Sequence, residues 1–133
     1  MTPISDLAQL LKTMEPVQSP GTYAFTMLPA DSIIDPETVV AYIREPEGAS
    51  AVVAEETATH LGLPISFRAA WLTLTVHSDL QAVGLTAAFS AALGQAGISC
   101  NVVSGTHHDH IFVPYEQADA AMAALRQLQQ APG

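Results

Sequence analysis

The sequence predicts an α+β protein in which helices cover one face of an antiparallel sheet. Three observations support this fold class. Residues 71–77 alternate apolar and polar side chains, as a half-buried strand does. Residues 84–96 carry apolar side chains at helical spacing, which predicts a helix lying on that sheet. Two more apolar runs, 98–103 and 111–113, and a last amphipathic stretch after Pro114 complete the order βαββα.

The first half of the chain is less regular, but each of its elements has a local signal. A helix is expected over about residues 4–13, where Ser5 or Asp6 can cap the exposed amide groups. The further elements expected are a strand at 22–28, a β-hairpin of residues 39–44 and 51–54 turning at 45–48, and a short helix at 55–61. Residues 29–38, between the strand and the hairpin, fit a crossover helix that has shrunk.

The second half gives stronger face assignments. Leu72, Leu74 and Val76 point to one face of their strand, and Trp71, Thr73, Thr75 and His77 point to the other. The apolar stripe of the helix that follows consists of Leu85, Ala88, Phe89, Ala92, Leu93 and Ala96. The face that carries Trp71 needs a covering partner, either the first half of the same chain or the surface of a homodimer.

Composition excludes several classes of function. The chain has 133 residues, and its 49% hydrophobic content argues against disorder. Four cations face thirteen carboxylates, giving a formal charge of −9, so a nucleic-acid partner is not expected, since binding phosphates requires clustered Lys and Arg.

The sequence also indicates a compartment. No apolar run approaches the roughly 18 to 20 residues that cross a bilayer, and the first residues lack the basic start of a signal peptide. We therefore expect a cytoplasmic protein without a membrane partner. The single cysteine, Cys100, is predicted to be a small core residue; the alternative, a reactive nucleophile, requires a stabilised thiolate.

Residues 84–98, Gly-Leu-Thr-Ala-Ala-Phe-Ser-Ala-Ala-Leu-Gly-Gln-Ala-Gly-Ile, resemble the ACT-domain segment in which an acidic residue and Pro-Gly precede a helix ending in Ala-Gly-Ile. Val83 stands where that family usually has proline. Gly-Thr-Tyr at 21–23, Glu-Pro-Glu-Gly at 45–48 and His-Asp-His at 108–110 are similar to segments of small bacterial proteins with two ACT-like domains in tandem.

The resemblance implies two ferredoxin-like, ACT-like βαββα subdomains packed side by side, a degenerate one at 1–66 and a second at 67–133. No fourth strand is evident after the last helix of the second subdomain. The resemblance implies that this strand comes from the other half of the chain or from a second subunit.

ACT pairs typically bind amino acids or similar effectors near the loop between the first strand and first helix, and the resemblance implies a regulatory, non-catalytic protein. Free amide groups at a helix start attract a carboxylate, and glycine allows close approach. The candidate ligand-binding residues are Asp79, Val83, Gly84, Leu85, Asn101 and Ser104. Structural alternatives remain, because Asp79 can simply cap a turn and Asn101 can satisfy neighbouring backbone.

A histidine-rich hairpin offers a metal-binding alternative. His108 and His110 share a face of their strand, and His77 can approach His110 if the two strands are neighbours. A zinc site usually needs three or four ligands, so a polar hairpin without metal is the favoured interpretation.

Signals of catalysis are missing from the sequence. It has no Walker-type phosphate loop and no Ser-His-Asp arrangement in a recognisable context, so we expect no enzymatic activity and no cofactor. The resulting hypothesis is a regulatory protein that binds a small polar effector, with an amino acid as the favoured ligand. The alternative is a structural or protein-interaction module whose ligand site is vacant.

Overall fold

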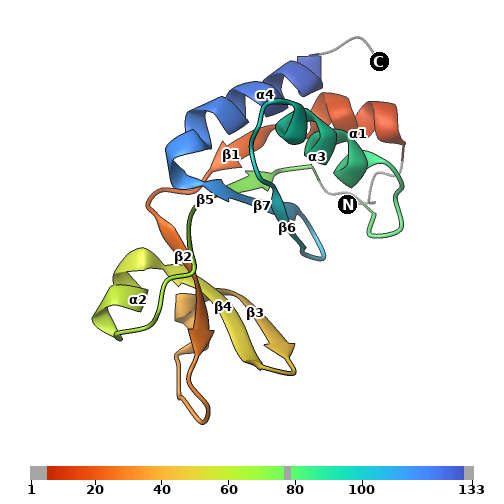
Figure 1. The fold of residues 1–133 in the computed structure, drawn as a ribbon. Helices are drawn as coiled ribbons and strands as arrows, with labels where there is room; N and C mark the ends of the chain where they lie inside the picture. The colour runs from red at the N-terminus through yellow and green to blue at the C-terminus, as the bar shows by residue number, and fades with distance from the viewer. Residues whose placement is uncertain (1–5, 77–78, 131–133) are drawn as a thin grey trace.

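One continuous antiparallel sheet organises the described part of the chain, residues 6–76 and 79–130, in the computed structural model (Figure 1). Its strands follow the order β3-β4-β2-β5-β7-β6, and β1 also pairs with β5. The strands are β1 (Pro16–Gln18), β2 (Tyr23–Leu28), β3 (Val39–Glu45), β4 (Gly48–Ala54), β5 (Phe67–Leu74), β6 (Asn101–Ser104) and β7 (Asp109–Pro114). The helices are α1 (Leu7–Thr13), α2 (Glu55–His60), α3 (Leu85–Gln95) and α4 (Ala118–Gln130), with 3-10 turns η1 (Pro36–Thr38) and η2 (Tyr115–Gln117).

The predicted βαββα order of the second half is confirmed as β5-α3-β6-β7-α4. Its first strand begins at Phe67, earlier than the alternation from Trp71 indicated, because residues 67–69 pair with β2. The end of β5 lies beside the start of β7 as expected, with Leu74 opposite Asp109.

The fourth strand of the second half is β1, from the beginning of the chain. Pro16, Val17 and Gln18 pair antiparallel with Leu74, Thr73 and Leu72. The sequence carries no local signal for this strand, since three residues are too few for a period-two pattern. The prediction that the strand could come from the other half of the chain is confirmed.

Strand β5 belongs to the sheets of both halves. One edge pairs with β2 at its beginning and with β1 at its end, while the other edge pairs with β7. It therefore acts as the last strand of the first half and as the first strand of the second. The domain division between residues 66 and 67 stays a prediction, and it falls immediately before this shared strand.

The first half keeps the strand pattern but loses a helix. Its predicted strand and hairpin are confirmed as β2, β3 and β4, and α1 begins after Asp6, whose carboxylate accepts a hydrogen bond from the Ala8 amide at 3.1 Å. Where a crossover helix would connect β2 to β3, the chain forms only the three-residue turn η1. The shrunken crossover expected at 29–38 is therefore confirmed.

All four helices lie on the same face of the sheet. Register places Ala24 of β2 opposite Arg68 of β5, so the α2 side of the first half continues into the α3 and α4 side of the second. The two cores on this face differ in size. The second is built from β5, β7, α1, α3 and α4, and the first contains Ala24, Leu28, Ala51, Val53 and Ala58.

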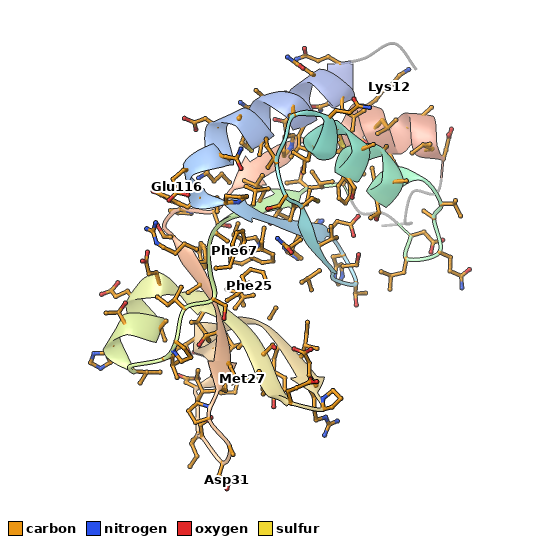
Figure 2. All side chains as sticks on the ribbon, in the orientation of Figure 1. Lys12, Phe25, Met27, Asp31, Phe67 and Glu116 are labelled. Carbon is orange, nitrogen blue, oxygen red and sulfur yellow. The ribbon has the colours of Figure 1, made fainter. Side chains whose placement is uncertain are left out.

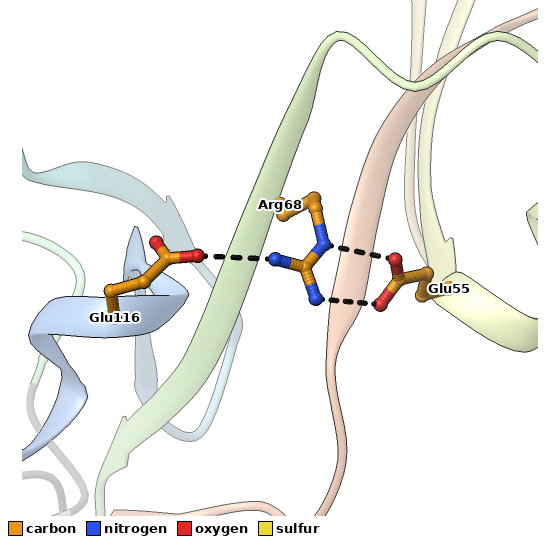
Figure 3. Close-up of polar contacts among 3 residues, drawn as sticks. All are labelled: Glu55, Arg68 and Glu116. Atoms are coloured by element: carbon orange, nitrogen blue, oxygen red, sulfur yellow. Dashed lines mark hydrogen bonds and ion pairs between the residues drawn. The ribbon is translucent and has the colours of Figure 1, made fainter.

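Arg68 joins the two halves on the helix face (Figure 3). Its guanidinium donates two hydrogen bonds to Glu55 at the start of α2, at 2.9 and 3.2 Å, and a third to Glu116 of η2 at 3.1 Å. Hydrogen bonding raises the pKa of Arg68 and lowers the pKa of Glu55. Because all three side chains remain partly exposed, solvent weakens this link.

The other side of the sheet, which carries Trp71, has no helix over it among the described residues. The first half contributes Tyr23 to this side, edge-on to the Trp71 ring with centroids 5.2 Å apart. It does so as a continuation of the same sheet rather than as a second layer, because Tyr23 lies on β2 and pairs with Ala69.

Candidate functional site

The start of α3 is the junction at which the sequence predicts ligand binding. Gly84 precedes the helix with φ 106°, a conformation that favours glycine, and among the residues that the structure describes no side chain caps this end by a hydrogen bond. The first amide groups of a helix have no partner within it, so those after Gly84 retain hydrogen-bonding capacity. Val83 is 84% exposed, whereas Leu85 is buried in the second core.

Gly84 is also a packing position. A Cβ atom added there would lie 2.9 Å from Cδ2 of Leu7, in α1. The first turn of α1 therefore lies directly against the α3 junction. Substitution of Gly84 tests the fold as well as any ligand site.

The loop before α3 holds Asp79 in a turn. Its side-chain oxygen accepts a hydrogen bond from the Gln81 amide at 2.9 Å, and its carbonyl accepts one from Ala82 at 2.9 Å. The turn-capping role that the sequence offered as the structural alternative for Asp79 is therefore present in the fold. It is compatible with a ligand role, because a carboxylate offers several acceptor positions.

The two candidates on β6 lie on opposite faces of the sheet. Asn101 is opposite Phe112 and donates a hydrogen bond to the Phe112 carbonyl at 3.3 Å. This contact with neighbouring backbone is the structural alternative that the sequence offered for Asn101. Ser104 is opposite Asp109 and donates to its carboxylate at 2.7 Å. Positions three apart on a strand face opposite ways. Ser104 and Asp109 therefore lie on the helix side near the end of β5, and Asn101 does not converge with them.

The histidine hairpin is engaged in hydrogen bonds. His110 Nδ1 accepts from the Trp71 indole at 3.0 Å and lies 3.2 Å from the Thr73 hydroxyl, while His108 Nδ1 lies 3.4 Å from the carbonyl of Val76. Burial lowers the pKa of His110, with a further contribution from His108. Among residues 6–76 and 79–130, no three His, Cys, Asp or Glu side chains form a potential metal site; His77 lies outside those ranges.

Cys100 lies just before β6, half-buried, with Sγ 3.8 Å from the Ser90 hydroxyl. Burial raises the pKa of its thiol. This environment favours the neutral thiol and supports a packing role rather than a nucleophilic one.

Sequence reasoning did not identify the hollows of the first half. One of ≈ 760 Å³ lies between residues 20–23 and α2. Another, of ≈ 350 Å³, lies between the segment after β2 and the β3–β4 turn, and Arg44, Asp31 and Glu47 are among its lining residues. The second hollow occupies the first half's equivalent of the strand-to-crossover loop. The sequence alone does not reveal this hollow, because its two walls belong to separate segments, the one after β2 and the β3–β4 hairpin, and only folding brings Asp31 to the same hollow as Arg44.

Two family models match the chain. One model of the ACT domain matches residues 2–70, and another matches residues 66–127. The matches overlap at the beginning of β5, the strand that both halves share. No curated protein sequence matches the chain.

Solved structures agree with this assignment. A protein of unknown function from Vibrio cholerae, described as a possible transport protein, is 41% identical with a TM-score of 0.80, covering 93% of this chain and 96% of that one. An Agrobacterium tumefaciens protein is 18% identical with a TM-score of 0.64, covering 82% and 84%. The ligand-free regulatory subunit of aspartate kinase from Thermus thermophilus is 11% identical with a TM-score of 0.66, covering 90% and 99%.

The longest helix in the described ranges is α4, and none there has the length and apolar character needed to cross a membrane.

ACT domains are regulatory modules that bind small molecules and do not catalyse reactions. The two family matches, the shared sheet and the similarity to the Vibrio cholerae protein together show that this chain belongs to the ACT-domain family, with two such domains in tandem.

Proposed function

We propose that this protein is a cytoplasmic sensor that binds an amino acid or a similar small polar metabolite without changing it chemically. The observation that carries the proposal is the tandem pair of ACT domains with a helix start, at Gly84, that no side chain in the described ranges caps. A ligand carboxylate would accept hydrogen bonds from the amides around Val83, Gly84 and Leu85. Its ammonium group would pair with Asp79.

Ser104 is the member of β6 that fits this site. Its position opposite Asp109, at the end of the sheet where β5 finishes, supports a polar contact with a ligand at the α3 junction. Asn101 fits the same ligand less well because it faces the other side of the sheet.

The hollow lined by Arg44 is a second location for the same kind of ligand. Arg44 can pair with a carboxylate, and Asp31 or Glu47 can pair with an ammonium group. This arrangement offers both charges of a free amino acid a partner within one ≈ 350 Å³ hollow.

A thermal-shift panel of the twenty amino acids and common nucleotides tests the proposal. A specific ligand at about a hundred times its Kd adds about 2.7 kcal/mol to the stability, enough to raise Tm by several degrees. No shift with any member of the panel, at concentrations up to about 10 mM, would contradict amino-acid binding and favour the interaction module. Stoichiometric retention of zinc after dialysis would instead favour the histidine hairpin.

Two variants then locate the ligand. Asp79→Ala should abolish the shift if the α3 junction binds it, and Arg44→Gln should abolish it if the first-half hollow does. Each variant is the other's control, since each removes one charge from one of the two candidate locations. The described residues form only the two ACT domains, without a catalytic or DNA-binding domain that the ligand could regulate. The regulatory signal would therefore pass through self-association as a homodimer or through a separate partner protein.

A further inference from the structure

The helix layer of the first half lacks a helix beside α2. In the second half, α3 lies next to α4 and buries Leu85, Phe89 and Leu93 on the sheet. The first half has the same strand pattern, with α2 in the place of α4, but the chain between β2 and β3 forms only a coil and the turn η1. Residues 29–38 therefore stand where α3 stands in the other half (Figure 1).

Three hollows border this coil, and Ile34 lines all of them. One hollow of ≈ 560 Å³ lies between the coil and α2, and we name it the α2 groove. Ile33, Ile34 and Asp35 line it from the coil, and Glu56, His60 and Leu61 line it from α2 and its end. The other two are the ≈ 350 Å³ hollow at the β3–β4 turn and one of ≈ 420 Å³ along β3.

The apolar side chains of the α2 groove are open to solvent. Ile33 is fully exposed and Leu61 is 51% exposed, whereas Ile34 is half-buried against the first core. Tyr42 of β3, 57% exposed, continues this apolar surface beyond Ile34, since both residues line the hollow along β3. Single exposed apolar side chains are ordinary, but several around one groove are typical of an interaction site.

Charge defines the chemistry of the occupant. Asp35 lies on one wall of the α2 groove and Glu56 on the other, and no Lys or Arg in the described ranges lines it. The hollow at the β3–β4 turn adds Asp31 and two glutamates against one cation, Arg44. Lys12 of α1 lies at the opposite end of the molecule from Asp31 (Figure 2). A partner with cations beside its apolar side chains would meet opposite charge on both walls, and an acidic partner would be repelled.

We propose that the α2 groove binds an amphipathic helix of a separate, basic partner protein, in which Lys or Arg flanks an apolar stripe. The second half provides the model for this geometry, because there α3 lies beside α4 and completes the layer on the same side of the sheet. A second copy of the chain, with its net charge of −9, does not match the acidic walls. The inference rests on the proposed function, whose signal has to reach a partner, and it names the surface and the chemistry of that partner.

A peptide derived from α3 tests the proposal on the full-length protein. The probe is residues 84–97 with four positions that are exposed in α3 changed to lysine, so that its apolar stripe is kept. These changes are Thr86→Lys, Ala87→Lys, Ala91→Lys and Gln95→Lys. Fluorescence anisotropy of the labelled peptide should give a Kd below about 0.1 mM. No binding at about 1 mM protein would overturn the proposal.

Two altered peptides separate charge from helix formation. The same peptide with glutamate at the four positions should bind at least about tenfold more weakly, because it meets the acidic walls. The lysine peptide with Ser90→Pro keeps the stripe but cannot form the helix, so its binding should be lost. Equal Kd values for the lysine and glutamate peptides would contradict the charge argument, and full binding of the proline peptide would contradict a helical occupant.

Matched variants of the protein place the binding site. Ile33→Gln removes a fully exposed apolar side chain and should raise the Kd of the lysine peptide at least about tenfold, whereas Leu80→Gln, at a 63% exposed position of the second half, should leave it unchanged. Leu61→Gln is the second groove variant. Equal Kd values for Leu80→Gln and the groove variants would overturn the assignment to this groove.

The acidic walls have a matched pair of their own. Glu56→Gln should weaken binding of the lysine peptide at about 0.05 M NaCl, and most of this difference should disappear at about 0.5 M. Asp119→Asn, on α4, removes the same charge outside the groove and should change the Kd little. Equal losses in the two variants would mean that the net charge of the chain, rather than the groove, attracts the peptide.

Other outcomes distinguish this inference from self-association and from the ligand proposal. A dimer in sedimentation velocity that Ile33→Gln dissociates would place a second copy in the groove and overturn the proposal. Binding of the lysine peptide without any response to the metabolite panel would contradict the sensor and leave the groove standing. Thermal shifts with a metabolite but no peptide binding would do the opposite.

Discussion

The two halves of the chain share a strand pattern but not a helix layer. In the first half, β3-β4-β2 and the start of β5 are covered by the six-residue α2, and only the turn η1 replaces a crossover helix. In the second, β6-β7-β5-β1 is covered by α1, α3 and α4 (Figure 1). The comparison shows that one sheet can carry two domains with unequal helix layers. Strand pairing holds the first half in place although only a short helix covers it.

The difference in size between the two cores predicts the largest effect on the free energy of unfolding. Leu93→Ala, at a fully buried position of α3, should lower the free energy of unfolding by a value near the top of the usual range of about 2–5 kcal/mol. Leu28→Ala, in the first half at 6% exposure, should cost less, because the thin cover can collapse around the cavity. Urea unfolding followed by circular dichroism compares the two. Equal costs would mean that the first half is as tightly packed as the second.

Gly84→Ala probes the contact between α1 and α3. Its left-handed φ of 106° costs an alanine about 1–2 kcal/mol, and the new methyl group must also displace Leu7. Gly94→Ala is the control, since it lies inside α3 with open space around it and should gain about 0.5–1 kcal/mol. Calorimetry of both variants measures the difference. A neutral Gly84→Ala would show that α1 does not rely on this contact.

His110 predicts a pH dependence for the second half. Burial lowers the pKa of His110 in the fold from its ordinary value of 6.5, so the folded state prefers the neutral ring. Below pH 6.5 the unfolded chain takes up a proton more readily than the folded one, so stability should fall as pH decreases. His108 strengthens this preference and Asp109 opposes it.

His110→Gln is the matched variant for that measurement. It removes the titration while keeping an acceptor within reach of the Trp71 indole. Urea midpoints between pH 8 and pH 5 should decrease more for the unmodified protein than for His110→Gln. Parallel curves would show that other groups cause the pH dependence.

Arg68→Gln is expected to have the smallest effect. Exposed ion pairs contribute little, and the side chains of Arg68 and Glu116 are 44% and 71% exposed. Arg68→Gln should lower Tm slightly at low salt relative to the unmodified protein, and this difference should disappear near about 0.5 M NaCl. Arg126→Gln, on α4, controls for the change in net charge. A large loss that persists in salt would show that Arg68 holds the halves together.

Local sequence patterns predict the elements of the second half and the faces that these elements bury. Helical spacing at Leu85, Phe89 and Leu93 predicts the buried face of α3, and alternation from Trp71 to Leu74 predicts which side chains of β5 face the core. These predictions succeed because side-chain periodicity follows from backbone geometry within one element. The turn at Asp79, which the sequence analysis gave as a structural alternative, is local in the same way and is present. The ligand role of the candidate residues stays a prediction.

Only the tertiary structure decided which elements meet. Residues 16–18 become a strand because the edge of β5 beside Leu72–Leu74 is otherwise unpaired, and three residues carry no periodic signal of their own. The contact of Leu7 with Gly84 and the helix-free side of the sheet around Trp71 both arise from packing and pairing between segments far apart in sequence. Non-local hydrogen bonds and packing, which no window of the sequence contains, fixed these features.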